Sequence, residues 1–555
     1  MENLLKVTNV LEIITRILVT IGLIIIIAPK KIKIINKLKN ILNPKETKIS
    51  NKIANKIFIG IFVLSVIILF YKLEKIPYGL HVDEAGMAYD AWCLSKHGVD
   101  RYLNTLPVYL INFGGGQSAL YAYLTAIIVR ITGMLNTFVI RLPAVLLSLI
   151  SLVLMYKMLQ ENKGNKEALI ISVLVTLCPW FIMKARWGLD CNLLSSMSII
   201  SIYFLIKAIN THKYRYFIIA GILFGITLYT YAISYIILPM FLIAFLLPML
   251  LKHKVNIKEM IIFSIPLAIL AIPLILLLLY NNEFIGEVKL PFITIPKLFN
   301  YRGAEISTLN MGENISNIFN ILFISDFLVY NGFGEVGTLY KMSIILVIIG
   351  FIISVANLFK RKQENKLLEG AFIVLFLSTF VCMLLIKSPN INKANCIYMP
   401  MIYFEMVGIV FLSKYIKYFD ILILCMMFIN FIFFISYYYF DYVKVKQPFF
   451  ENDVIEITEY IEDKNDNKTI YFYDRDLRHP YIYTLFVNKT SPYKFNKSAK
   501  NKGFSGYKNY RFYFPEPIDK KAIYILDTDD NKNIEDLEDK GFYKKIINKY
   551  CILYK

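Results

Sequence analysis

The sequence predicts a polytopic α-helical membrane protein with about twelve transmembrane helices and a small C-terminal α/β domain. Three observations support this fold class. Hydrophobic residues make up 57% of the 555 residues and charged residues only 18%, whereas soluble proteins carry about 25% charged residues. The apolar residues gather in runs of roughly 18 to 22, long enough to cross ~30 Å of hydrocarbon. From Asp441 onward the composition becomes polar.

Apolar segments along the chain give the candidate membrane spans. They lie at residues 9–28, 57–73, 139–157, 168–185, 193–209, 216–234, 235–251, 260–280, 342–358, 368–386, 397–412 and 419–438. The segment 118–132 is also apolar, but it is only about 15 residues long and contains Arg130, so we expect it to lie at the membrane interface. The first segment is expected to stay as a helix, since Pro29 and two lysines stand where signal-peptide cleavage needs small residues.

The net charge of +20 is concentrated in loops between apolar segments. One loop alone holds nine lysines, namely Lys30, Lys31, Lys33, Lys37, Lys39, Lys45, Lys48, Lys52 and Lys56. Lysine-rich short loops are typical of the cytoplasmic side and contact anionic lipids; a polyanionic ligand is the alternative. If 118–132 does not cross, the other short basic loops fall on this same side. Loops 74–138 and 281–340, which include acidic stretches, are then predicted to be extracytoplasmic.

The predicted domains follow from this topology. Residues 1–56 form an N-terminal helix and a basic cytoplasmic loop, residues 57–440 a transmembrane catalytic domain, and residues 441–555 an extracytoplasmic α/β domain. In the last of these, Thr469–Tyr473 and Ala522–Leu526 have the pattern of strands. The amphipathic segments Val454–Glu462 and Ile534–Tyr550 are predicted to be helices.

The seven cysteines show no C-x-x-C pair and no Cys/His spacing of a metal site. Six of them lie in or beside apolar segments, where a free cysteine behaves as a small hydrophobic residue. The sequence therefore predicts neither a disulfide framework nor a zinc site.

The residues that point to chemistry begin at Asp83 and Glu84, just after the second apolar segment. Two adjacent carboxylates at a membrane surface are costly unless they are solvated, paired or functional. Taken alone, the pair also fits a helix start, with Asp83 capping a helix over Glu84–Lys96. Other polar residues on the predicted outer side follow it, namely Asp90, Asp100, Arg101, Gln117, Tyr121, Arg141, Arg186 and Asp190.

At these positions the chain resembles the GT-C superfamily of glycosyltransferases, specifically the protein mannosyltransferase and aminoarabinose-transferase-like branch, glycosyltransferase family 39. The resemblance covers roughly residues 57–440 and is strongest in Pro77–Tyr123, Arg141–Pro143 and Arg186–Asp190. Gln117-Ser-Ala-Leu-Tyr121 stands where the family has a basic residue or histidine followed by Pro-Pro-Leu-Tyr. This departure suggests a subgroup with a different donor or acceptor.

The resemblance implies roles for individual residues. Asp83 matches the catalytic acid, Glu84 its neighbour and Asp190 the acid of the second outer loop. We expect Asp83 to be the general base, Asp190 to orient the acceptor or tune Asp83, and Glu84 to be available for a possible Mg²⁺ or Mn²⁺ ion. Arg186 is the first candidate for the donor phosphate. The other candidates for substrate contact are Gln117, His81, Tyr121, Arg302, Lys387 and Lys393.

The predicted function is transfer of a sugar from a polyprenyl-phosphate donor to an acceptor on the extracytoplasmic face, and two alternatives stay open. These are an envelope glycan polymerase or ligase, and a lipid or polysaccharide transporter. The expected partners are the lipid-linked donor, the bilayer, and an acceptor protein, lipid or glycan, with no nucleic acid. The Lys-, Ile- and Asn-rich composition indicates a bacterial plasma membrane protein and undecaprenyl phosphate as the carrier.

Overall fold

The computed structural model describes residues 2–27, 49–299, 311–324, 337–360, 366–442, 450–463, 468–499 and 504–555. The chain forms two compact units, and each is assembled from three stretches of sequence. The first comprises Met1–Tyr71, Ala144–Leu274 and Arg302–Lys444, and the second Lys72–Pro143, Ile275–Tyr301 and Val445–Lys555. The predicted segments 1–56, 57–440 and 441–555 describe membrane topology, and the compact units follow a different division.

The first unit is helical, and two of its helices, α6 and α12, continue into the second. The helices are α1 (Glu2–Ile27), α3 (Asn51–Phe70), α6 (Thr137–Asn162), α7 (Asn165–Leu177), α8 (Pro179–Ala185), α9 (Cys191–Thr211), α10 (Tyr214–Thr227), α11 (Ser234–Leu251), α12 (Ile257–Asn281), α13 (Met311–Phe319), α14 (Ser343–Phe359), α15 (Lys366–Leu385), α16 (Tyr398–Ser413) and α17 (Phe419–Ser436). Each apolar segment predicted to span the membrane overlaps one or more of these helices, although residues 228–233 of the segment 216–234 lie outside them. Within the described residues, eight helices are long and apolar enough to cross a bilayer.

The predicted span 168–185 is not one straight helix. It is broken into α7 and α8, which are bent by 62° and would make a ninth span if taken together. The cause is Pro179, because a proline disfavours helical geometry in the residue before it, and Cys178 is extended with φ −70° and ψ 123°. Helices α10, α14 and α16 are shorter than the other spans, so the predicted number of crossings stays a prediction.

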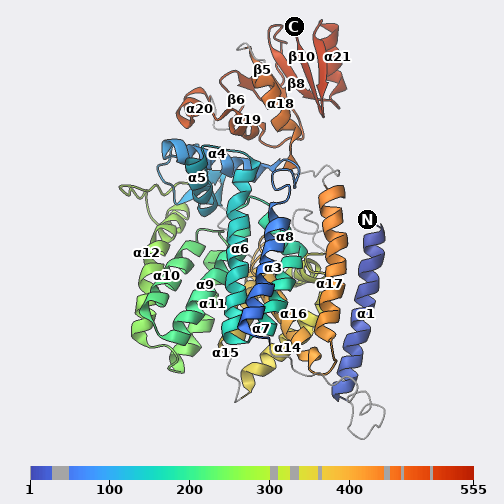
Figure 1. The fold of residues 1–555 in the computed structure, drawn as a ribbon. Helices are drawn as coiled ribbons and strands as arrows, with labels where there is room; N and C mark the ends of the chain where they lie inside the picture. The colour runs from blue at the N-terminus through green and yellow to red at the C-terminus, as the bar shows by residue number, and fades with distance from the viewer. Residues whose placement is uncertain are drawn as a thin grey trace. The chain divides into compact units, whose positions relative to one another are not determined.

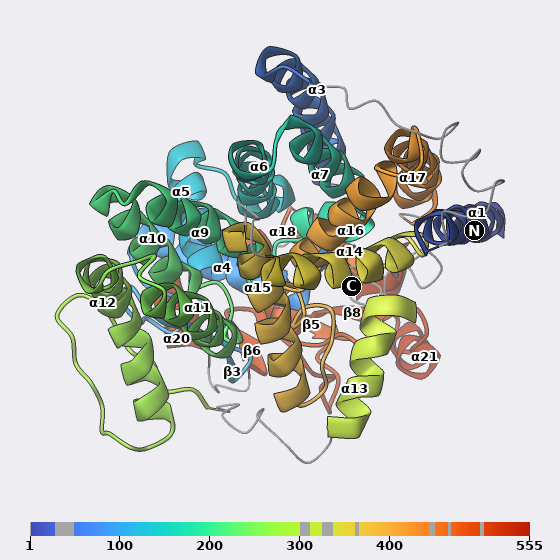
Figure 2. The ribbon, with the colours of Figure 1, turned by 90° about the horizontal axis from the view of Figure 1, so that it is seen from below.

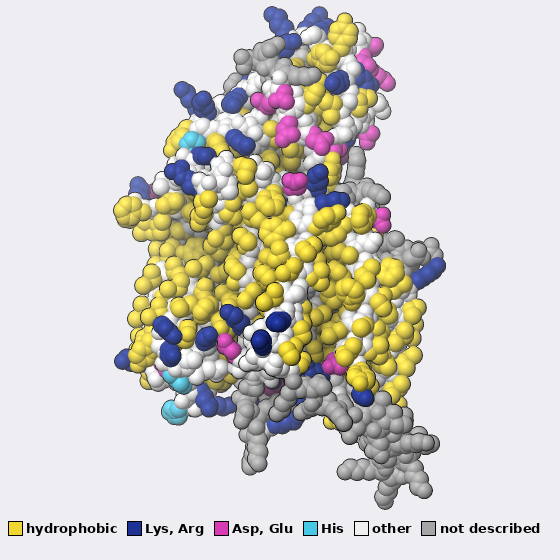
Figure 3. Space-filling view, in the orientation of Figure 1, with side chains coloured by type: hydrophobic (Ala, Val, Ile, Leu, Met, Phe, Trp, Pro, Cys, Tyr) yellow, Lys and Arg dark blue, Asp and Glu magenta, His cyan; other side chains and the backbone are white. Residues whose placement is uncertain are grey.

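Neighbouring helices of the first unit pack in a few close pairs. In Figure 1, α1 runs beside α17, and Figure 2 shows α14 alongside α16 and α9 beside α10. Apolar side chains cover the exposed flanks of these helices in Figure 3. Such a surface is unfavourable in water and suits a lipid environment, which agrees with the predicted membrane location.

The closest packing is between α14 and α16, where two glycines let the backbones touch. A Cβ atom on Gly350 would lie 1.6 Å from the carbonyl oxygen of Phe404, and one on Gly408 would lie 2.3 Å from that of Leu346. Small residues at helix crossings allow this close approach in membrane proteins. The two helices are therefore fixed to each other by backbone contact.

We expect Gly350→Ala to lower the stability of the folded protein by about 1–3 kcal/mol or more, because the added methyl group forces the two backbones apart. The measurement is thermal unfolding of the purified protein in detergent. Gly60→Ala on α3 is the matched control, since no atom lies within 4 Å of the added Cβ there. Equal unfolding temperatures for the two variants would contradict this account of the α14–α16 contact.

The second unit begins with β1 (Leu80–His81), α4 (Val82–His97), the hairpin of β2 (Tyr109–Asn112) and β3 (Gly115–Ser118), and α5 (Leu120–Thr132). Helix α5 packs against α4, and Arg130 donates a hydrogen bond to the carbonyl of Ser95. At about 1.5 Å per residue, its 13 residues extend only ~20 Å, short of the ~30 Å of hydrocarbon. These dimensions agree with the prediction that 118–132 does not span the membrane.

The C-terminal part of the second unit is an α/β structure, as predicted. Its elements are β4 (Phe450–Glu451), α18 (Asp453–Glu462), β5 (Ile470–Tyr473), α19 (Pro480–Asn488), α20 (Pro492–Ser498), β6 (Gly506–Tyr507), β7 (Tyr510–Arg511), β8 (Ile523–Asp527), α21 (Asn531–Asp539), β9 (Tyr543–Ile547) and β10 (Tyr550–Tyr554). Six strands form one sheet in the order β6-β7-β5-β8-β10-β9. Strand β5 is parallel to β7 and β8, and β10 is antiparallel to its two neighbours.

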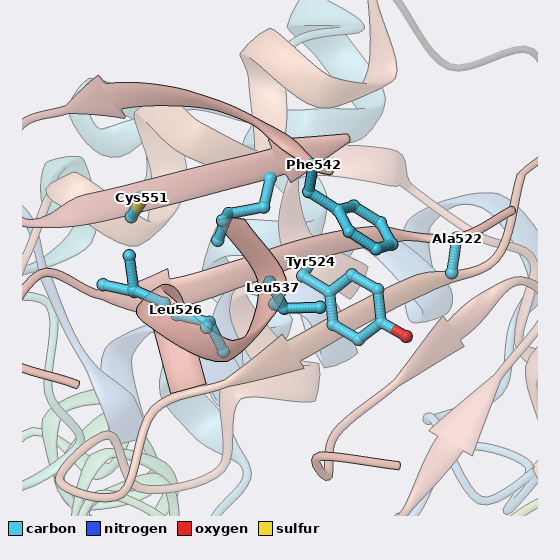
Figure 4. Close-up of a cluster of buried hydrophobic side chains, with 8 residues drawn as sticks. Ala522, Tyr524, Leu526, Leu537, Phe542 and Cys551 are labelled. Carbon is cyan, nitrogen blue, oxygen red and sulfur yellow. The ribbon is translucent and has the colours of Figure 1, made fainter. Parts of the chain in front are cut away.

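Helix α21 covers one face of this sheet and buries a small apolar core. Figure 4 shows Leu537 of α21 close to Tyr524 and Leu526 of β8, with Phe542 and Cys551 beside them. The predicted helix over Ile534–Tyr550 is correct only in its first part. Gly541 has a φ of +82° and ends the helix, and the chain then returns as the β9–β10 hairpin.

Candidate functional site

The site begins at the N-terminus of α4, where His81 is the capping residue. The Nδ1 atom of His81 accepts a hydrogen bond from the backbone N–H of Asp83, and the Glu84 carboxylate accepts one from the backbone N–H of His81. This reciprocal arrangement is a capping box. The sequence taken alone predicts Asp83 as the capping residue. In the structure the capping residue is His81. The Asp83 carboxylate is left available for other contacts.

Asp83 is the accessible carboxylate of this helix start. Its side chain is 38% exposed, against 14% for His81. The Asn112 side-chain amide donates a hydrogen bond of 2.9 Å to Asp83 Oδ1, and His81 Nδ1 lies 3.6 Å from Asp83 Oδ2. The sequence prediction that His81 shares a site with Asp83 agrees with these distances.

The orientation of Asn112 is set by a buried ion pair behind it. Arg101 donates to both carboxylate oxygens of Asp90 at 2.7–3.0 Å, and its Nη2 also donates to Asn112 Oδ1 at 3.2 Å. Because a guanidinium is a donor only, it must face the oxygen of the amide. The Asn112 nitrogen is thereby turned toward Asp83. A Cβ atom on Gly86 would lie 2.7 Å from Asn112 Oδ1, so the glycine leaves room for this network.

Glu84 has a different environment from Asp83, because it is fully buried against Arg141. Arg141 Nε donates to Glu84 Oε1 at 3.0 Å. The remaining Arg141 donors reach backbone carbonyls of the segment before α4, those of Leu73, Pro77 and Gly79. Arg141 thus ties the start of α6 to the segment that leads to Asp83. This geometry favours a structural role for Glu84 over the predicted availability for a cation.

Gln117 and Tyr121 are both buried in the second unit. Gln117 lies on β3 opposite Leu110 of β2, and it is 4% exposed. The Tyr121 hydroxyl donates to the carbonyl of Ile140 at 3.0 Å, which joins α5 to the start of α6. Tyr121 therefore has a packing role, and the predicted substrate contacts of both residues stay predictions.

The C-terminal part of the second unit contributes residues beside Asp83 that the sequence did not indicate. Strand β4 pairs with β1, and Phe450 stands opposite His81. The ring of His479 stacks on Phe113 with centroids 4.2 Å apart. Burial lowers the pKa of His479 below its ordinary value, and the Asp83 carboxylate opposes this shift. No local motif links His479 to Asp83, because their electrostatic interaction depends on segments far apart in the sequence.

Arg186 and Asp190 belong to the first unit. Arg186 is fully buried and donates to the carbonyls of Ile68, Leu69 and Tyr71 at the end of α3. This geometry favours capping of a helix C-terminus over the predicted phosphate contact. Asp190 caps α9 through a hydrogen bond from the backbone N–H of Cys191. Its predicted catalytic role stays a prediction.

The remaining predicted cations also lie in the first unit. Lys387 is exposed, and the Lys393 ammonium donates to the Lys387 carbonyl at 2.8 Å. Arg302 lies outside the described residues. Within the part of the chain that is described, no three His, Cys, Asp or Glu side chains form a cluster that could hold a metal ion. The possible divalent cation stays a prediction.

The cap on α4 has a consequence for pH dependence. Burial lowers the pKa of His81 below its ordinary value of 6.5, and the Asp83 and Glu84 carboxylates oppose the shift less strongly. The unfolded chain then takes up a proton at a higher pH than the folded chain. This part of the stability is complete above about pH 6.5 and is lost as the pH falls below it.

We expect His81→Asn to reduce the loss of stability between pH 7.5 and pH 5.5, because asparagine caps a helix without titrating. The measurement is the unfolding temperature of the purified protein at the two pH values. His253→Asn is the control, since His253 is exposed and lies in the first unit. The cap explanation fails if the wild type and His81→Asn lose the same stability on acidification.

Comparison with known families matches residues 117–280 to the model for dolichyl-phosphate-mannose-protein mannosyltransferases. The matched stretch is less than half of the chain. Comparison with curated proteins gave no match.

The fold is similar to several solved structures. One is ArnT from Cupriavidus metallidurans bound to undecaprenyl phosphate, at 10% identity and a TM-score of 0.56, over 89% of this chain and 97% of ArnT. Another is the Archaeoglobus fulgidus oligosaccharyltransferase in the apo form, at 12% identity and a TM-score of 0.51, over 86% of this chain and 70% of that protein. These similarities confirm the predicted GT-C fold, and the family match agrees with a membrane glycosyltransferase.

Proposed function

We propose that this chain, which has the GT-C fold, is a membrane glycosyltransferase that moves a sugar from a polyprenyl-phosphate donor to an acceptor hydroxyl, with Asp83 as general base. The observation that carries this proposal is the environment of the acids around α4. Glu84 is neutralised by Arg141, and Asp90 by Arg101. The Asp83 side chain is 38% exposed and is held by a neutral amide. It is therefore the carboxylate of this group that is free to accept a proton from a substrate.

The donor class is supported by the family match and by the ArnT complex, whose bound ligand is undecaprenyl phosphate. In such a donor the sugar C1 is bonded to a phosphate oxygen, and phosphate is a good leaving group. The acceptor oxygen attacks C1 while Asp83 takes the acceptor proton. The bond from C1 to the phosphate oxygen breaks, and its electron pair leaves with the polyprenyl phosphate. A single displacement of this kind inverts the configuration at C1.

The network behind Asp83 serves this step by fixing one carboxylate oxygen. The Asn112 amide engages Oδ1, so Oδ2 is the oxygen that can face the acceptor. Asn112 cannot rotate without breaking its hydrogen bond to Arg101. A base held in one orientation contributes more than a mobile one, because the entropy of positioning is already lost before the substrate binds.

We further propose that the reaction takes place on the extracytoplasmic face of a bacterial plasma membrane. The support is the distribution of lysines in the sequence, which predicts that loop 74–138 lies on the side opposite the basic loops. Arg186 is a weaker candidate for the donor phosphate than the sequence suggests, because its two Nη groups donate to carbonyls at the end of α3. The GT-C fold favours this reading over a transporter. An envelope glycan polymerase or ligase would use the same lipid-linked chemistry.

The test is sugar transfer by the purified full-length chain in liposomes that contain undecaprenyl phosphate linked to a radiolabelled sugar. A panel of donor sugars is combined with membrane extracts that supply acceptors. The expected result is release of free undecaprenyl phosphate and movement of label into an acceptor for at least one sugar. If every donor stays intact at the level of liposomes without protein, the proposed function is wrong. Addition of EDTA, followed by Mg²⁺ or Mn²⁺, tests the predicted cation.

A further inference from the structure

A cavity of about 340 Å³ lies in the first unit, where the ends of α14 and α16 meet the starts of α7 and α15. The helices that form it are labelled in Figure 2. Its polar lining includes Lys163, Glu167, Asn357, Lys360, Glu369 and Lys414, and α16 supplies apolar side chains such as Val407 and Phe411. The catalytic proposal uses none of these residues. The volume is roughly ten times the ~30 Å³ that one water molecule occupies in the liquid.

Glu369 gives this cavity an acceptor that its neighbours do not satisfy. The side chain is fully buried. Its Oε1 atom accepts hydrogen bonds from Lys163 Nζ at 2.7 Å and from Asn357 Nδ2 at 2.9 Å. Among the described residues, no donor reaches Oε2. A buried carboxylate oxygen without a donor is costly, so a ligand with N–H groups would be stabilised there.

Two of the three lysines that line the cavity lie at its exterior. Lys360 and Lys414 are exposed, whereas Lys163 pairs with the buried Glu369. The inner end of the cavity therefore holds an ion pair with one unsatisfied carboxylate oxygen, the outer end is basic, and α16 supplies an apolar wall. A purely anionic ligand would bring its charge toward Glu369 if it entered fully. A divalent metal ion would need several more oxygen ligands than one paired carboxylate supplies.

We propose that this cavity binds the headgroup of a phospholipid that carries both a phosphate and a primary ammonium, as phosphatidylethanolamine does. The ammonium donates to Glu369 Oε2, and the phosphate lies between Lys360 and Lys414. The apolar side chains of α16 contact the glycerol and the first carbons of the acyl chains. A quaternary ammonium has no N–H to donate, so the site discriminates against the choline headgroup.

The test is native mass spectrometry of the delipidated full-length protein in detergent with added phosphatidylethanolamine, phosphatidylcholine or phosphatidylglycerol of identical acyl chains. The expected result is at least tenfold tighter binding of phosphatidylethanolamine, with affinity falling as the ammonium is methylated stepwise. Equal affinity for the ethanolamine and choline lipids, stronger binding of phosphatidylglycerol, or no retained lipid overturns the proposal.

Variants separate this site from general lipid contact. Lys360→Gln with Lys414→Gln should weaken phosphatidylethanolamine binding about tenfold and leave folding intact, since both side chains are exposed. Glu369→Gln should abolish the preference for ethanolamine over choline. Lys417→Gln is the control, because Lys417 is exposed near the end of α16 but does not line the cavity. The assignment is wrong if Lys417→Gln weakens binding as much as the double variant.

Discussion

Asp83→Asn is expected to lower the rate of sugar transfer by roughly 10²–10⁴-fold, the usual contribution of a general base. The substitution removes the proton acceptor but keeps the shape of the side chain. An asparagine at this position still offers an oxygen to the Asn112 amide, which now donates to Asp83 Oδ1. The fold should therefore be preserved, with a change in stability within about 0.5 kcal/mol. The measurement is the initial rate of transfer from labelled donor in liposomes, with the unfolding temperature taken from the same preparation.

The control for this result is Asp476→Asn, which makes the same change of charge at an exposed position of the second unit. Its transfer rate should equal that of the wild type. Transfer by Asp83→Asn at the wild-type rate would remove Asp83 from the mechanism and leave the GT-C fold assignment untouched.

Glu84→Gln is expected to destabilise the protein by about 3–5 kcal/mol, the cost of removing one partner from a buried ion pair. The reason is Arg141, whose guanidinium is fully buried and has Glu84 as its ion-pair partner. Backbone carbonyls solvate it but do not neutralise its charge. The measurement is the yield of folded protein and its unfolding temperature in detergent.

Glu74→Gln is the matched control, because Glu74 is exposed in the segment that leads to α4. A double-mutant cycle with Arg141→Gln isolates the pair energy; the double variant should be more stable than Glu84→Gln alone. The result also separates two roles for Glu84. If Glu84→Gln folds with wild-type stability but transfers no sugar, Glu84 acts in catalysis and the structural assignment is wrong.

Much of the helical architecture could be predicted from the sequence, because membrane-spanning helices leave a strong signal in long apolar runs. The prediction for residues 118–132 also rests on length and charge. The break at Pro179 is not predictable from hydropathy, since the apolar pattern continues through it. The pattern of Ile534–Tyr550 predicts a helix throughout because its apolar spacing continues past Gly541, where the chain turns back.

The candidate site was only partly predictable. Asp83 stood out because a carboxylate beside a membrane span needs a reason. The separate roles of Asp83 and Glu84 could not be predicted, because they depend on which arginine pairs with which acidic side chain. Arg141 and Glu84 are separated by much of the second unit's first stretch, and their contact is a matter of tertiary structure. Arg186 matched a family position, yet its three carbonyl contacts at the end of α3 depend on packing that spacing does not encode.

The second unit is assembled from the early, middle and late parts of the chain. Its contacts can therefore form only after the last of these parts has been synthesised. Strand β1 beside Asp83 pairs with β4, which the ribosome makes only after nearly all membrane helices. The Tyr89 hydroxyl likewise donates a hydrogen bond to the carbonyl of Thr490, which is also synthesised late. A nascent or prematurely terminated chain therefore carries Asp83 without its finished surroundings. We therefore expect a chain that ends before β4 to transfer no sugar, because Asp83 then lacks the strand that pairs beside it.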